Sequence, residues 1–145
     1  MARLQLPNPP PSSPAVRAVM KANRAKDTEP ERTLRFALRE AGYPGYRLNW
    51  KRAPGRPDIS YPGRRVAVFV HGCYWHHCPR CHPYLPKSNP EFWARKFELN
   101  RERDARKRRQ LEAADWRVFE IWECDIRDRL GGVVVEISTT LKERA

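Results

Sequence analysis

The chain has 145 residues, 40% of them hydrophobic and 32% charged, which is the balance of one globular domain and excludes a multidomain protein. Lysine and arginine number 29 against 17 aspartates and glutamates, so the net charge of +12 favours a polyanionic partner such as nucleic acid. The longest apolar run, Val66–Val70, is far shorter than the roughly 20 residues that span a bilayer, so an integral membrane protein is excluded.

The amino-terminal segment is rich in proline. The prolines within residues 1–15 disfavour a helix or a central strand and predict a disordered or extended arm, followed by a single domain over residues 16–145. Residues 1–20 lack the apolar stretch of a secretory signal, so we expect a cytoplasmic protein. In a reducing cytoplasm, four cysteines are expected to be metal ligands or buried thiols and not disulfides.

The first predicted helix begins at Thr28. Thr28 is the expected N-cap, and Glu31 stands at the third helical position, where it completes a capping box. Gly42 is placed to end this helix. Apolar residues between them recur at spacings of three and four and give the helix one buried face: Leu34, Ala37, Leu38 and Ala41.

Four segments rich in β-branched and aromatic residues are predicted to be strands. They are separated by glycine and proline: Tyr46–Trp50, Asp58–Tyr61, Arg65–Val70 and Arg117–Trp122. The run 66–70 is apolar at every position, which indicates a central strand buried on both faces.

A second helix is predicted from Asn89, the cap, through Pro90, its first residue, to about Ala114. Trp93, Phe97 and Leu111 are expected to face the core. Its basic side chains are expected to remain in solvent: Arg101, Arg103, Arg106, Lys107, Arg108 and Arg109. The order helix, strands, helix, strand predicts an α/β sheet covered by helices.

The four cysteines have the spacing of a metal site. Cys78 and Cys81 form a Cys-x-x-Cys knuckle, Cys73 lies just upstream, and Cys124 ends the last predicted strand. Four thiolates would bind structural zinc and staple two strand ends together, a closed site that stabilises without catalysing. Two alternatives remain: four reduced cysteines, or a set in which a histidine replaces one cysteine, with His77 and His82 as the candidates.

Hydrolysis of a phosphodiester needs a divalent ion to offset developing charge and a base to activate water. Asp58, the Val70 carbonyl, His71 and His76 are predicted to meet at the ends of neighbouring strands. The simpler interpretation of Asp58 alone is a turn aspartate. Glu31 is likewise explained by its capping position.

Two aromatic residues, Tyr74 and Trp75, lie beside histidines in a basic sequence. Such rings wedge between base pairs or stack on bases in some DNA-binding proteins. Packing over the zinc site explains them equally well. Asn100 and Asp104 lie four residues apart on the helix face of Trp93 and by themselves are ordinary exposed residues.

Several motifs in order resemble the very-short-patch-repair family of DNA mismatch endonucleases. The similarity runs from about residue 20 to residue 127 and rests on the following segments: Asp27-Thr28-x-x-Glu31, Pro54-Gly55-Arg56-Pro57-Asp58, Phe69-Val70-His71-Gly72-Cys73-Tyr74-Trp75-His76, Pro90-Glu91-Phe92-Trp93, Asn100-x-x-x-Asp104 and Trp116-Arg117-Val118-x-x-x-Trp122-Glu123-Cys124.

The resemblance implies a restriction-endonuclease-like α/β fold, a PD-(D/E)xK variant with a central mixed sheet flanked by helices and a structural zinc site. It implies strand-specific nicking 5′ to the thymine of a T:G mismatch left by deamination of 5-methylcytosine. By motif, Asp58 would bind catalytic magnesium with the Val70 carbonyl as a further ligand. His76 would be the general base, and His71 would support the scissile phosphate.

The remaining roles also follow from the resemblance. Glu31 would act through magnesium-bound water or an adjacent histidine. Tyr74, Trp75 and Trp93 would intercalate beside the mismatch, and Met20 would enter from the opposite groove. Asn100 and Asp104 would lie close to the active-site network.

The resemblance further implies a monomer in a bacterial cytoplasm, associated with the nucleoid, that acts on double-stranded DNA. Mismatch-repair proteins and a cytosine-5 DNA methyltransferase of the same cell are the expected further partners. Two alternatives differ in function: a nuclease of the same fold for another DNA structure, and a zinc-stabilised DNA-binding module without catalysis. The second requires neither Asp58 nor His76.

Overall fold

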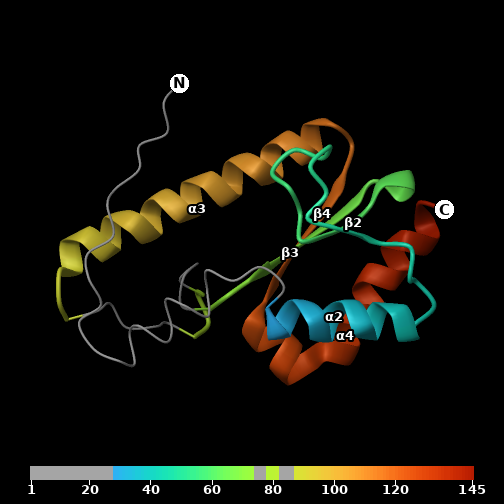
Figure 1. Cartoon of the computed structure of the whole chain (residues 1–145), viewed down its shortest axis with the longest axis horizontal. Helices are drawn as coiled ribbons and strands as arrows, with labels where there is room; N and C mark the ends of the chain where they lie inside the picture. The colour runs from blue at the N-terminus through green and yellow to red at the C-terminus, as the bar shows by residue number, and fades with distance from the viewer. Residues whose placement is uncertain (1–27, 74–77, 82–86) are drawn as a thin grey trace.

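A computed structural model describes residues 28–73, 78–81 and 87–145, and Figure 1 shows how its elements are arranged. The predicted arm over residues 1–15 and its boundary lie outside the described residues. The elements in chain order are α2 (Glu29–Glu40), β1 (Arg47–Leu48), β2 (Ile59–Tyr61), the 3₁₀ turn η1 (Pro62–Arg64), β3 (Val66–His71), α3 (Pro90–Ala113), β4 (Arg117–Trp122) and α4 (Glu123–Glu143).

The four strands form one mixed sheet in the order β1-β2-β3-β4. β1 and β2 pair antiparallel, as do β2 and β3, whereas β3 and β4 pair parallel. Parallel neighbours need a crossover connection, and α3 supplies its helix. α3 covers one face of the sheet, and α2 with α4 covers the other (Figure 1). The predicted α/β sheet flanked by helices is therefore confirmed.

β3 is the central strand, and its side chains alternate between two cores. Val66 and Val68 pack in the core formed with α2 and α4, whereas Ala67 and Phe69 pack with Leu111 of α3. The side chains of these four β3 residues are all buried. The prediction that this apolar run is a strand covered on both faces is confirmed.

α2 has the predicted bounds but not the predicted capping box. Thr28 is the N-cap, and Gly42 follows the helix with a φ of +98°, a value that suits glycine. The Thr28 side chain makes no capping hydrogen bond. Pro30 at the second helical position has no N–H, which removes one of the two donors that such a cap binds.

α3 buries the three side chains predicted for its core face, Trp93, Phe97 and Leu111. Asn89 precedes it but makes no side-chain capping bond, because its backbone is left-handed and not extended. The prediction that all of its basic side chains lie in solvent is wrong for two of them. Lys107 and Arg108 are partly buried, the first against Gly55 and the second in ion pairs with glutamates.

The carboxy-terminal helix α4 was not predicted. Val133, Ile137 and Leu141 recur every four residues and are fully buried, which is the signal of a helix face. Two neighbouring glycines and a run of β-branched valines mask that signal in the sequence. Cys124 accordingly lies in the first turn of α4 and does not end a strand as predicted. Among the described residues, no helix combines the length and the apolar character that crossing a membrane requires.

Substitutions in α4 test this packing. Val133 is 0% exposed, so Val133→Ala should lower the free energy of unfolding by about 2 kcal/mol through lost burial and a cavity. Val135 on the same helix is 64% exposed, and Val135→Ala should change it by less than about 0.5 kcal/mol. Urea unfolding of both variants measures the difference. Equal effects would contradict the placement of α4.

Candidate functional site

The first part of the site is the edge of the sheet where β3 ends. Because β2 runs antiparallel to β3, Asp58 just before β2 lies beside the end of β3. Its Oδ2 accepts a hydrogen bond of 2.7 Å from the Val70 N–H. The structure therefore brings together the Asp58 carboxylate and the strand segment that carries the Val70 carbonyl. Carboxylate and carbonyl oxygens are the hard donors that Mg²⁺ prefers.

His71 is the last residue of β3 and is 5% exposed. Its ring stacks on Phe69 at 6.2 Å between centroids and lies 5.1 Å from the Trp122 ring. These neighbours fix the plane of the imidazole next to the Asp58–Val70 contact. A cavity of about 490 Å³ opens beside it, lined by His71, Pro79, Arg101, Asp104, Ala105, Arg108, Arg109, Glu120 and Trp122.

Gly55 determines how the segment before Asp58 packs. Its φ is +76°, and a Cβ at this position would lie 2.8 Å from Cβ and Cγ of Lys107. Side chains rarely adopt this backbone conformation, and these Lys107 atoms are too near the helix to move away. The glycine thus allows the chain that leads to Asp58 to lie directly against α3.

The second part of the site is a cluster of the four cysteines. Cys73 follows β3, Cys78 and Cys81 lie in the next loop, and Cys124 lies in α4. Their four sulfur atoms all lie within 4.8 Å of one another, and the Cys78 and Cys124 sulfurs are 3.8 Å apart. A tetrahedron with Zn–S bonds of about 2.3 Å has edges of about 3.8 Å, so the Cys78–Cys124 separation matches it and the whole cluster lies within about 1 Å of that size.

Electrostatics around the thiols agree with a cation site. Burial raises the pKa of Cys73 and of Cys124. For Cys78 burial also acts upward, but hydrogen bonds from the backbone N–H groups of Cys81 and Arg80 outweigh it and lower its pKa to about 7. Thiols with raised pKa values lose their protons only when a cation compensates the thiolate charge. The donor set therefore suits a metal, and the all-cysteine set needs no histidine.

The structure places the other predicted site residues at several points. Glu31 is partly buried in the first turn of α2, and Trp93 is 3% exposed and packs edge-on to Phe92. Asn100 accepts a hydrogen bond of 3.0 Å from Arg103, while Asp104 lines the cavity beside His71. The remaining candidates lie outside the described residues: Met20, Tyr74, Trp75, His76, His77 and His82.

Sequence reasoning missed Arg80 and Asp125, which flank the cysteine cluster and contact each other at 2.6 Å. The available signal was an aspartate three residues after Trp122, since an acidic residue at that position typically caps a helix start. This signal becomes visible only once the start of α4 is known, and the glycines and valines of that helix conceal it in the sequence.

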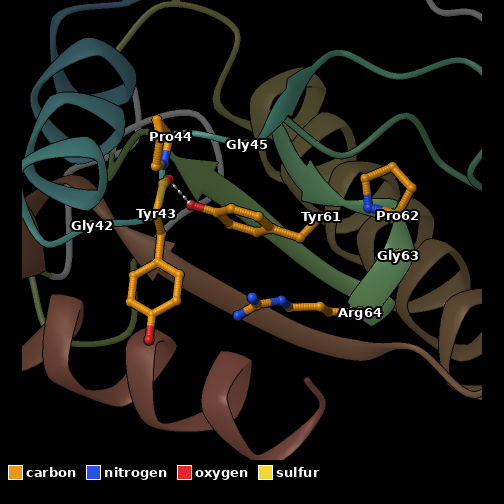
Figure 2. A pocket seen from close by; sticks show the side chains of 8 residues that line it. All are labelled: Gly42, Tyr43, Pro44, Gly45, Tyr61, Pro62, Gly63 and Arg64. Carbon is orange, nitrogen blue, oxygen red and sulfur yellow. Dashed lines mark hydrogen bonds between the residues drawn. The ribbon is translucent and has the colours of Figure 1, made fainter.

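A second hollow of about 310 Å³ lies at the opposite end of β3, beside η1 (Figure 2). The Tyr61 hydroxyl donates a 2.8 Å hydrogen bond to the Tyr43 carbonyl, as the dashed line shows. Arg64 stacks over the Tyr43 ring at 5.5 Å and donates to the Leu141 carbonyl at 3.1 Å. These polar groups serve to join α2, η1 and α4, and the hollow is separate from the Asp58 edge.

Comparisons with known proteins identify the family to which the chain belongs. The family profile described as "DNA mismatch endonuclease Vsr" matches residues 13–82. "Type II nicking enzyme V.XorIIP" of Xanthomonas oryzae pv. oryzae is 42% identical over 125 residues, which cover 86% of this chain and 90% of the relative. "DNA mismatch endonuclease Vsr" of Escherichia coli K12 is 38% identical over 111 residues, covering 76% and 70% of the two chains.

A third relative, "Type II nicking enzyme V.NmeAIP" of Neisseria meningitidis, is 39% identical over 127 residues that cover 82% of this chain and 89% of its own. An α/β sheet with an aspartate and a histidine at one edge, next to a thiolate cluster, fits a DNA-cleaving enzyme. The chain belongs to the Vsr family of DNA endonucleases.

The packing of Gly55 is open to a direct test. Gly55→Ala should lower the free energy of unfolding by about 1 to 3 kcal/mol, because it adds strain at a positive φ and a clash with Lys107. Gly63→Ala is the matched control, since a Cβ there meets nothing within 4 Å. Thermal unfolding compares the two variants. A Gly55→Ala protein as stable as Gly63→Ala would refute the close approach.

Proposed function

We propose that this enzyme nicks duplex DNA strand-specifically, 5′ to the thymine of a T:G mismatch that arises by deamination of 5-methylcytosine. The observation that carries the proposal is the hydrogen bond between Asp58 Oδ2 and the Val70 N–H beside the buried His71. It joins two strands at the sheet edge where the resemblance locates the reaction. The proposed fold is accordingly a PD-(D/E)xK variant, supported by the mixed sheet with Asp58 at the start of β2.

Asp58 and the Val70 carbonyl are the proposed magnesium ligands. When bound there, the ion would supply Lewis-acid stabilisation of the charge that develops on the phosphoryl oxygens. The Val70 N–H holds one carboxylate oxygen in place at 2.7 Å, so the ligand is oriented before substrate arrives. Glu31 is proposed to assist through bound water or a neighbouring histidine.

The two histidines have different proposed roles. His71 is clamped between aromatic rings, which suits a group that supports the scissile phosphate and keeps one orientation. His76 is the proposed general base that takes the proton of the attacking water. Its neighbours in sequence, Tyr74 and Trp75, are proposed to intercalate beside the mismatch, with Met20 opposite. Trp93 would join them only after turning outward, because it is 3% exposed.

The proposed DNA-binding surface continues along α3. Its exposed basic side chains are well placed for backbone phosphates, whose neutralisation makes affinity depend on salt: Arg101, Arg103, Arg106 and Arg109. Asp104 of the same helix lines the cavity beside His71, and Asn100 precedes it by four residues; both are proposed to complete the site. Monomeric action suits an asymmetric lesion of this kind.

A second candidate is a nuclease of the same fold that acts on another DNA structure. The names of two relatives favour it, since both are nicking enzymes whose names mention no mismatch. The two candidates share the Asp58 edge and differ only in substrate. An assay therefore distinguishes the two candidate functions by comparing DNA substrates, whereas substitutions at the shared site would affect both.

The decisive assay is nicking of end-labelled duplexes that carry T:G, T:A or C:G pairs, other mismatches or unpaired flaps. We expect cleavage of T:G duplexes alone, in magnesium and not in EDTA. Asp58→Asn keeps an acceptor for the Val70 N–H but removes the charge, so it should lower the rate at least about 100-fold. Asp128→Asn, at an exposed aspartate of α4, is the control. Cleavage of flaps in preference to T:G would favour the second candidate.

The cysteine cluster is proposed to hold one structural zinc ion through Cys73, Cys78, Cys81 and Cys124. Mass spectrometry under native conditions should find one zinc per chain. Cys78→Ser should lose the metal and lower the unfolding temperature, because a closed zinc site contributes directly to folding. Cys81→Ser tests the exposed ligand. A protein that keeps zinc without either thiol would show that histidines supply the ligands.

A further inference from the structure

Asp125 is a charged residue for which the proposed reaction has no role. Its side chain is 3% exposed, and it follows Cys124 directly in the first turn of α4. A carboxylate removed from water to this extent is costly unless several donors compensate for the lost hydration. The structure supplies three donors, and two of them come from outside the turn that carries Asp125.

Arg80 is the strongest of these partners. Its Nη1 lies 2.6 Å from Asp125 Oδ1, and the Arg80 side chain is half exposed whereas that of Asp125 is buried. Arg129 Nε also donates to Oδ1 at 3.1 Å, and the Trp122 N–H donates to Oδ2 at 3.0 Å. The carboxylate is therefore shared between a loop, a strand end and a helix.

The position of Arg80 in the sequence gives this contact its meaning. Arg80 stands inside the Cys78-x-x-Cys81 loop, whereas Asp125 stands next to Cys124. The ion pair thus joins the segment with two of the thiols to the turn with a third. Arg129 cannot do this, because it belongs to α4 itself and also pairs with Glu136 at 3.2 Å.

Charge favours the same arrangement. A complex of one divalent cation with four thiolates has a net charge of −2, so positively charged side chains close to the cluster stabilise the complex. Arg80 provides such a cation and is kept near the sulfurs by Asp125. The other carboxylate oxygen holds the backbone of Trp122, whose ring lies 5.1 Å from that of His71. Asp125 therefore contacts Arg80 of the cysteine loop and the backbone of the residue whose ring packs beside His71.

We propose that Arg80 and Asp125 are positioning residues that close the thiolate site, by holding the Cys78–Cys81 loop against the Cys124 turn in the geometry that zinc requires. The inference rests on the zinc site in the proposed function. It concerns metal retention and not cleavage, so its failure is separate from any failure of the nicking assay.

The test uses the full chain loaded with Zn²⁺ and challenged with a chelator while a chromogenic indicator reports the metal released. Arg80→Gln and Asp125→Asn should each release zinc about tenfold faster than the unchanged chain, the lower end for residues that support metal ligands. The double variant should be no faster than the faster single variant, because both changes remove one shared contact. Asp125→Asn retains an acceptor for the Trp122 N–H, so α4 keeps its first turn.

The matched control is Arg95→Gln. Arg95 lies on α3 and pairs with Glu98 at 3.2 Å, but both side chains are exposed and the pair includes neither the cysteine loop nor the Cys124 turn. Zinc release from this variant should equal that of the unchanged chain. Release at the unchanged rate from Arg80→Gln and Asp125→Asn would overturn the proposal, as would equal acceleration by the control.

Cobalt separates ligand positioning from a general loss of stability. The protein loaded with Co²⁺ should show the visible absorption of a tetrahedral thiolate site, and Arg80→Gln should shift or weaken those bands. Arg80→Lys restores the charge with a single donor group and should recover part of the absorption and of the retention. Unchanged cobalt bands in Arg80→Gln would mean that the pair only stabilises the fold, which contradicts the assignment.

Discussion

β3 is hydrogen-bonded on both edges and covered on both faces, and this double burial organises the other strands and the helices around it. Its middle has room only for apolar side chains, because polar groups buried there would have no partners. The polar and metal-binding candidate residues therefore lie where the strand leaves the core. His71 ends it, the Val70 backbone binds Asp58, and Cys73 follows two residues later. The proposed catalytic edge and the thiolate cluster are neighbours because both start at the end of one strand.

The parallel pairing of β3 with β4 brings the fourth cysteine to this edge. His71 lies opposite Trp122, and the chain turns into α4 directly afterwards, so Cys124 arrives 3.8 Å from Cys78. A metal bound by the cluster would connect the end of β3, the following loop and the start of α4. Cys73 and Cys124, which it would join, are 51 residues apart in the sequence. Because closing a long loop costs entropy, such a tie stabilises the folded edge more than local contacts can.

Much of the fold could be predicted because each element carries a local signal. The apolar run of β3, the helix face of α2 and the Asn89-Pro90 start of α3 all depend on neighbours in sequence. α4 could not be predicted in this way. Gly131 and Gly132 weaken its helical pattern of apolar residues, and the burial of Val133 comes from packing against α2 and the sheet. The capping bond expected of Asn89 is absent because its backbone is left-handed, which no local pattern indicates. Thr28 has the extended backbone of a cap but makes no capping bond, and Pro30 offers it no N–H.

The candidate site divides in the same way. The residue types can be read from the sequence alone, since hard oxygen donors, histidines and a Cys-x-x-Cys pair imply their chemistry wherever they lie. The same holds for the basic charge that favours a nucleic acid. Folding adds the contact of Asp58 with the Val70 N–H, the convergence of four thiols within 4.8 Å, and the burial of Asp125 against Arg80. Strand pairing and burial create these contacts between residues far apart in the chain, so spacing along the sequence does not encode them.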